Sequence, residues 1–218
     1  TPAVREVPPL LRLPLLLLGM AALVIGSLAG LARLGVEVPA LAQAQAGGHG
    51  ALMVAAFFGT VISLERAVAL RRLWPYGGPL AAGLGGLALL AAALAWLPPA
   101  LFILGGAVLT GASGAVLWQQ PALYTVTLAL GALGWLAGNA VWLASADLGA
   151  AVPFWMAFLV LTIAGERLEL TRFLPPRVAA SSVFAGLLTL VVVTTGLTAA
   201  GDSTAARGFG LGLLGLAV

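Results

Sequence analysis

Residues 15–32 read LLLLGMAALVIGSLAGLA, and this stretch decides the fold. The run is apolar on every side of a helix, whereas a strand of a transmembrane β-barrel would alternate apolar and polar residues over about 10 positions. Its length approaches the roughly 20 residues that a helix needs to cross a bilayer. The stretch therefore predicts a transmembrane α-helix.

The same character extends along the whole chain. Its 218 residues are 61% hydrophobic and 8% charged, far from the composition of soluble domains. Turn-like segments separate the apolar runs. The predicted spans are 10–34, 48–70, 76–97, 100–118, 123–145, 151–170, 178–199 and a last one that begins near Arg207. We therefore predict an all-α polytopic transmembrane helix bundle of about eight helices, surrounded by the lipid bilayer.

Residue usage excludes several kinds of chemistry. The chain has no cysteine, which excludes disulfides, iron–sulfur ligation and thiolate chemistry. Its basic residues are all arginine, so no lysine is present to form a retinal Schiff base. The net charge of +3 comes from arginines beside the spans and indicates membrane orientation, not nucleic-acid binding. The chain starts at Thr1 without methionine and ends at Val218 inside an apolar run, so we expect one or both ends to be incomplete.

The arginines predict which way the bundle is inserted, because cytoplasmic loops carry an excess of basic residues. With a cytoplasmic N-terminus, the basic residues on the inside are Arg5, Arg12, Arg71, Arg72, Arg172 and Arg177. The outside then carries Glu37, Asp147 and Asp202, with only Arg33 and Arg207. We therefore expect a multi-pass protein of the cell (inner) membrane with its N-terminus inside.

An internal repeat relates the two halves of the chain. ISLERAVALRRLWP (62–75) aligns with IAGERLELTRFLPP (163–176) at an offset of 101 residues. An even number of predicted spans separates the two copies, so both run in the same direction. The alignment predicts one membrane domain, 1–218, built as two parallel four-helix units of approximately 10–118 and 119–218.

Glycines recur at the four-residue spacing that lets helices approach closely in lipid. The pairs are Gly26 with Gly30, Gly134 with Gly138, and Gly208 with Gly212. We interpret all three as helix-packing sites.

His49 is the only histidine, and it opens the second predicted span. Met53 lies four residues later and so shares its helix face. Imidazole is a common haem ligand. Two side chains one turn apart cannot take opposite faces of a porphyrin, so His49 would be the metal ligand and Met53 would pack against the ring. Alternatively, His49 is an interfacial residue at the end of a span, where a polar ring costs little.

The stretch HGALMVAAFF (49–58) resembles the His-Gly-x-x-Met stretch in the second helix of haem-copper oxidase subunit I. It is also similar to the histidine-containing second helix of the NnrS family of membrane proteins. The resemblance covers about the first two helices. It implies a reduced relative that either holds one haem b near the outer face, with His49 as the ligand carried over, or has lost the haem. Those oxidases use several further histidines, which this chain lacks, so oxygen or nitric-oxide reduction by this chain alone is not expected.

Two acidic–basic pairs, Glu65–Arg66 and Glu166–Arg167, occupy equivalent places in the repeat. Across the two units, Glu65 would meet Arg167 while Glu166 meets Arg66. One interpretation is a clamp that joins the halves. The other is a quinone-headgroup site or proton path, because ionisable groups in membranes are often functional.

Asn139 is the one strongly polar residue deep in its predicted span, between Trp135 and Trp142. In hydrocarbon its amide needs a hydrogen-bond partner. We expect an interhelical hydrogen bond there in preference to a ligand site.

Three functional hypotheses remain open. The first is a haem-binding subunit associated with electron transfer or a respiratory-type complex, working with other membrane subunits. The second is a cofactor-free structural subunit of a larger membrane complex. The third is a small transporter, which the scarcity of polar residues disfavours. No phosphate loop or serine–histidine pattern predicts catalysis by the chain on its own.

Overall fold

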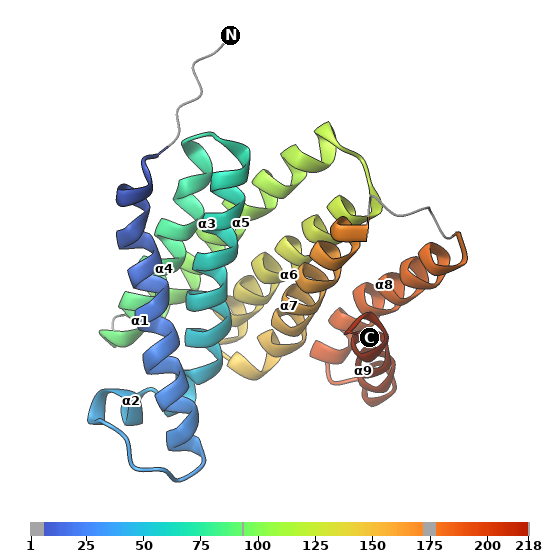
Figure 1. The fold of residues 1–218 in the computed structure, drawn as a ribbon. Coiled ribbons are helices and arrows are strands. Elements are labelled where there is room, and N and C mark those ends of the chain that lie inside the picture. Colours follow the sequence, from blue (N-terminus) through green and yellow to red (C-terminus); the bar gives the residue numbers. More distant parts are fainter. Residues whose placement is uncertain (1–6, 93, 172–177, 218) are drawn as a thin grey trace. The chain divides into compact units, whose positions relative to one another are not determined.

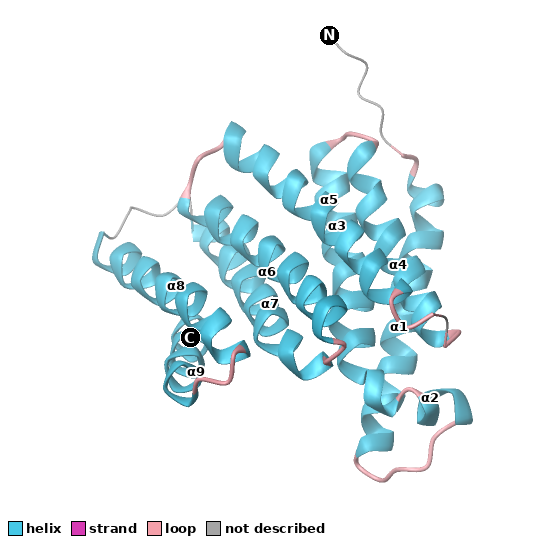
Figure 2. Cartoon of the chain, turned by 180° about the vertical axis from the view of Figure 1, so that it is seen from behind, coloured by secondary structure: helices cyan, strands magenta, loops and turns pink. Residues whose placement is uncertain are grey.

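The computed structural model describes residues 7–92, 94–171 and 178–217, and all regular structure in these residues is helical (Figures 1 and 2). The α-helices are α1 (Pro9–Arg33), α2 (Ala40–Ala44), α3 (Gly59–Leu70), α4 (Gly77–Leu90), α5 (Leu97–Gln119), α6 (Leu123–Ser145), α7 (Leu148–Leu170), α8 (Val178–Ala199) and α9 (Ser203–Ala217). A π-helical segment, η2 (Ala51–Phe58), runs directly into α3, and 3-10 turns η1 (Ala46–Gly48) and η3 (Trp74–Tyr76) precede η2 and α4. The all-α prediction is confirmed.

Among the described residues, six helices are long and apolar enough to cross a membrane. They are Pro9–Arg33, Ala51–Leu70, Leu97–Gln119, Leu123–Ser145, Leu148–Leu170 and Ala179–Ala199. The helices α4 and α9 have 14 and 15 residues, so at about 1.5 Å per residue each is shorter than the roughly 30 Å hydrocarbon core. The chain is therefore a multi-helix membrane protein. Of the eight or so predicted spans, the last of which was expected to be cut short, six are long enough to cross a membrane in the described residues.

The end of α4 differs most from the sequence-based expectation. We predicted a helix over 76–97, but α4 ends at Leu90 and Ala92 adopts a left-handed conformation with φ 47°. The next helix begins at Leu97, with Pro98 and Pro99 in its first turn, where proline is well tolerated. The chain therefore turns inside an alanine-rich run that carries no glycine or proline to signal it.

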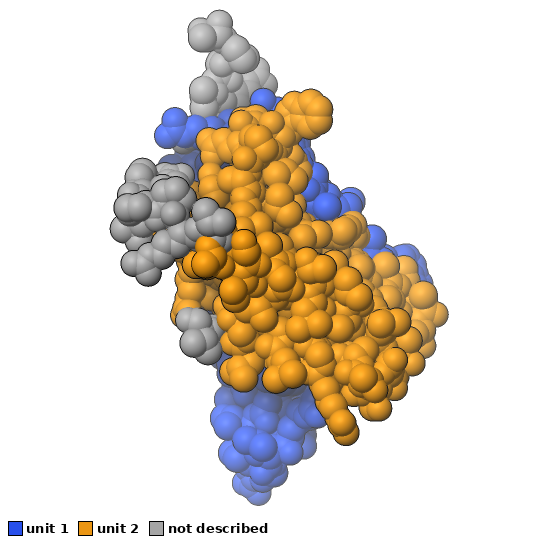
Figure 3. Space-filling model, turned by 90° about the vertical axis from the view of Figure 1, so that its right-hand side faces the viewer, with its two compact units in different colours: residues 1–112 blue, residues 113–218 orange. Residues whose placement is uncertain are grey.

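The chain divides into two compact units, Thr1–Ala112 and Ser113–Val218, coloured separately in Figure 3. The division falls within α5, six residues before the predicted boundary at 118 (118 − 112). The parallel four-helix repeat stays a prediction, and its second copy runs into residues 172–176, outside the described residues.

Unit 1 is held together by small residues that let its helices approach closely. In α1 the buried residues are Gly19, Ala22, Gly26, Ala29 and Ala32, and in α4 they are Gly78, Pro79, Ala81, Ala82, Gly83, Gly85 and Gly86. Helix α1 packs against η2, α3 and α4 (Figure 1). Larger side chains fill the resulting notches, so that Leu18 lies on Gly83 and Phe102 lies on Gly85. Packing of this kind drives helix association in lipid.

Unit 2 pairs α6 with α7 and α8 with α9, and α7 also contacts α8 (Figure 1). The α6–α7 interface has glycines as notches on both helices: Gly131, Gly134 and Gly138 on α6, and Gly165 on α7. On α9, Gly212 receives Val191 and Gly215 receives Leu187. A Cβ at position 134 would lie 3.2 Å from the carbonyl oxygen of Phe154. The prediction that the spaced glycines are packing sites is therefore confirmed in unit 2.

A matched pair of glycine substitutions tests this packing. A Cβ at position 85 would lie 2.6 Å from Cε1 of buried Phe102, whereas one at Gly114 would meet nothing within 4 Å. Because overpacking costs about 1–3 kcal/mol, we expect Gly85→Ala to lower the free energy of unfolding by that amount. Gly114→Ala is expected to leave it unchanged or raise it by up to about 1 kcal/mol, through helix propensity. Unfolding in detergent, followed by circular dichroism, checks both; equal losses would contradict the prediction.

Candidate functional site

His49 begins the continuous helix that continues through η2 into α3, and its ring lies against α1. Its Nδ1 is 2.7 Å from the carbonyl oxygen of Gly26. A carbonyl can only accept, so this hydrogen bond requires the proton on Nδ1. The lone pair of the neutral ring then belongs to Nε2, which has no hydrogen-bond partner among the described residues.

Glycines of α1 form the surface on which His49 and Met53 rest. A Cβ at position 30 would lie 2.8 Å from Cε1 and 2.9 Å from Nδ1 of His49. A Cβ at position 26 would lie 3.0 Å from Sδ of Met53. Both side chains therefore face α1, as the four-residue spacing predicts. The Gly26–Gly30 pair, which we expected only to pack helices, also makes room for the imidazole ring.

The backbone beside His49 is itself unusual. Residues Ala51–Phe58 form a π-helix of 8 residues. This conformation is rare, occurs mostly as single turns inside α-helices, and is frequent at functional sites. Ala51, Leu52, Ala55 and Ala56 are buried in it, while Met53 is half-buried. The π-helix therefore buries three alanines and Leu52 inside unit 1, and Leu52 and Met53 both pack against Gly26 of α1.

Gln45 holds the segment before His49 in place, and the sequence analysis missed it. It is 8% exposed, and its Nε2 donates a 3.1 Å hydrogen bond to the carbonyl oxygen of Leu89. That carbonyl is in the last turn of α4 and also accepts a 3.1 Å hydrogen bond from the Ala92 N–H, just after the helix. Gln45 thus fixes the chain ahead of His49 to the end of α4. The segment 34–48 also carries Glu37 and Gln43, so the sequence alone did not distinguish Gln45.

The described residues contain no group of three or more histidine, cysteine, aspartate or glutamate side chains able to hold a metal ion together. His49 is therefore one protein ligand at most within this set. Its geometry suits that role, because metal-bound histidines almost always donate their second ring N–H to a carbonyl, carboxylate or water. This hydrogen bond leaves Nε2 as the ring nitrogen that is available to a ligand.

The acidic–basic pairs lie near the ends of α3 and α7. In these helices Glu65 and Arg167 are exposed, and Arg66 and Glu166 are half-buried. The predicted reciprocal pairs would join unit 1 to unit 2, so the pairing stays a prediction. Of the arginines used to predict orientation, Arg5, Arg172 and Arg177 lie outside the described residues.

Asn139 is fully buried, as expected, but its hydrogen bond is not interhelical. Its Nδ2 donates to the carbonyl oxygen of Trp135, one turn earlier in α6, at 2.8 Å. Our prediction of an interhelical hydrogen bond is therefore wrong for this amide N–H, because a backbone carbonyl of the same helix lies within hydrogen-bond distance. Its Oδ1 is buried and has no hydrogen-bond partner within the described part of the chain.

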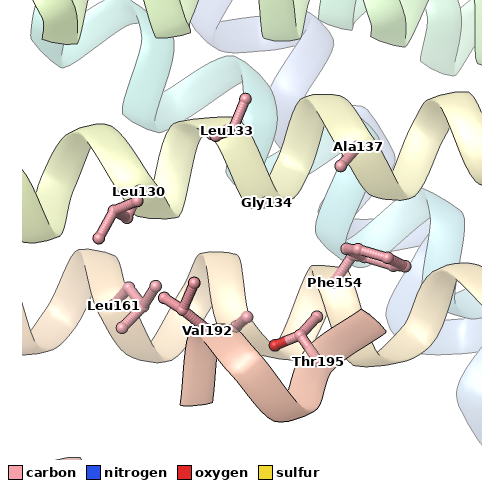
Figure 4. Close-up of a pocket in the computed structure, with 9 residues that line it drawn as sticks. Leu130, Leu133, Gly134, Ala137, Phe154, Leu161, Val192 and Thr195 are labelled. Atoms are coloured by element: carbon pink, nitrogen blue, oxygen red, sulfur yellow. The ribbon is translucent and has the colours of Figure 1, made fainter. Parts of the chain in front are cut away.

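An apolar groove of about 140 Å³ lies between α6, α7 and α8 (Figure 4). It is lined by Leu130, Leu133, Gly134, Ala137, Phe154, Ala157, Leu161, Val192 and Thr195. The one hydroxyl in this set, that of Thr195, already donates to the carbonyl oxygen of Val191 at 2.6 Å. The groove therefore offers shape without an unused polar group.

Helices long enough to span a bilayer, packed through glycine notches, define a multi-pass helical membrane protein. Residues 12–218 match the family described as Domain of unknown function (DUF8744), and the chain belongs to that family. No curated protein and no solved structure matches the chain.

Proposed function

We propose that this chain is an integral membrane subunit that binds one haem b through Nε2 of His49. The observation that carries the proposal is the 2.7 Å contact between His49 Nδ1 and the Gly26 carbonyl oxygen. This hydrogen bond fixes the tautomer, so Nε2 keeps its lone pair for a ligand bond. A bound haem supplies one-electron redox chemistry.

The residues around His49 have separate tasks in this proposal. The Gly26 carbonyl orients the ring, and Gly30 allows the ring to lie close to α1. Met53 would contact the edge or face of the porphyrin from the same helix. A second axial ligand would come from another helix or another subunit.

The proposal extends to the place of the protein in the cell. The arginine distribution supports insertion in the cell (inner) membrane with a cytoplasmic N-terminus, which puts His49 at the outer end of its span. A haem there suits electron transfer within a larger, respiratory-type membrane complex. The acidic–basic pairs would then lie at the opposite, inner end of the bundle. In the same hypothesis they form a site for a quinone headgroup or a proton path.

A spectroscopic experiment on the wild-type chain tests the proposal. The protein is expressed with haem supply, purified in mild detergent, and measured as a reduced-minus-oxidised visible spectrum with a pyridine haemochrome assay. We expect α and Soret bands of a b-type haem at close to one haem per chain. A folded protein with no haem, before and after incubation with added haemin, would contradict the proposal for the isolated chain.

The second candidate is a cofactor-free structural subunit. The specific observation in its favour is that the His49–Gly26 hydrogen bond joins the His49 helix to α1, and this is a sufficient role for a polar side chain in lipid. On this hypothesis His49 contributes to stability, the purified chain carries no haem, and partner subunits co-purify with it.

A further inference from the structure

The α6–α7 interface of unit 2 encloses three polar atoms that have no hydrogen-bond partner among the residues that the structure describes. They are Oδ1 of Asn139, Nε1 of Trp135 and Nε1 of Trp155. The three side chains are 0%, 0% and 2% exposed. Buried polar atoms are normally paired, because an unpaired one loses its bond to water without replacement. Three in one helix interface indicate that something polar belongs between them.

The three residues lie at neighbouring levels of the interface. Asn139 is one turn after Trp135 on α6, and its Nδ2 is bonded to the Trp135 carbonyl oxygen at 2.8 Å. This bond fixes the orientation of the amide, so Oδ1 is the acceptor. From α7, Trp155 reaches the same level, because its Nε1 would be 3.0 Å from a Cβ at Gly138, the neighbour of Asn139.

Aromatic rings close the cluster on two sides. Phe158 stacks on Trp135 with ring centroids 5.5 Å apart, and Trp142 meets Trp155 edge-on at 5.9 Å. The ligand must therefore be small. The apolar groove of Figure 4 lies nearby along Gly134 and Phe154, but it presents no unused polar atom and is not this site.

The chemistry of the three atoms defines the ligand. Each indole N–H can only donate, so the two indoles cannot bond to each other, and Oδ1 can only accept. A ligand must accept two hydrogen bonds and donate one. Water has two lone pairs and two protons, and buried waters make about three hydrogen bonds to otherwise unpaired groups. We propose that Trp135, Asn139 and Trp155 hold one water molecule inside unit 2.

The test is solid-state NMR on the full chain in lipid bilayers, with tryptophan labelled with ¹⁵N at the indole. Magnetisation is transferred from water protons to the indole N–H groups. We expect transfer to the indole signals of Trp135 and Trp155, which Trp135→Phe and Trp155→Phe assign. If either indole signal receives no transfer in the folded wild-type protein, the proposal is overturned.

Asn139→Leu separates the bound water from a direct bond between an indole and the amide. It keeps the approximate side-chain volume and removes the acceptor that the water needs. We expect transfer to both indole signals to fall several-fold in this variant, whereas undiminished transfer would overturn the assignment of Asn139. If the variant does not fold, the wild-type spectrum decides alone. Trp118, which is 90% exposed, provides the matched control for the labelling and transfer.

Discussion

Replacement of His49 by alanine is expected to remove the haem completely. The chain has one histidine and no cysteine, so no second imidazole or thiolate can replace the ligand. The variant also loses the 2.7 Å contact to the Gly26 carbonyl oxygen, and interhelical hydrogen bonds in membranes contribute about 1–2 kcal/mol at most. The measurement is the haem-to-protein ratio from the pyridine haemochrome assay.

His49→Gln separates the ligand from the structural role. A glutamine amide can still donate to the Gly26 carbonyl, but it does not replace imidazole as a haem ligand, so we expect a folded protein without haem. Met53→Leu keeps the contact with Gly26 and is expected to retain most of the haem. Haem retained in both His49 variants would mean that the iron is held elsewhere. A different result would favour the structural subunit. In that case the wild-type protein carries no haem, His49→Ala lowers the free energy of unfolding, and His49→Gln does not.

Helix positions could be predicted where long apolar runs end in proline or charged residues. The predicted spans 123–145 and 178–199 have the bounds of α6 and α8. Helix α7 begins three residues earlier than expected, because Asp147 caps it by accepting a 2.8 Å hydrogen bond from the Gly149 N–H. Such a cap is a recognisable sequence signal.

Elements fixed by tertiary contacts could not be predicted in the same way. Nothing in the run after Leu89 signals the end of α4, where Gln45, distant in sequence, bonds to the Leu89 carbonyl oxygen. The partner of His49 was hidden for the same reason, because a backbone carbonyl such as that of Gly26 leaves no trace in side-chain chemistry. The shared face of His49 and Met53 was predictable, since helical spacing alone determines it.

Truncation of Trp135 is expected to cause the largest loss of stability in unit 2. The ring is fully buried and stacks on Phe158 at 5.5 Å. Replacement of a buried tryptophan by alanine costs about 3–5 kcal/mol in soluble proteins. The matched control is Trp118→Ala, because Trp118 is 90% exposed, and such surface changes are usually within about 0.5 kcal/mol. Unfolding in detergent, followed by near-UV circular dichroism, gives the free energy of unfolding of both variants.

The comparison also distinguishes two sources of stability. Lipid tails are as apolar as a leucine side chain, so the transfer of an apolar ring from lipid into the protein interior contributes little hydrophobic free energy. A loss of about 3 kcal/mol at Trp135 would therefore measure mainly the dispersion contacts of a close-packed ring. Equal losses at Trp135 and Trp118 would contradict this packing model, because the two side chains differ chiefly in whether protein surrounds them. If only Trp135→Ala destabilises the fold, close packing in the α6–α7 interface holds unit 2 together.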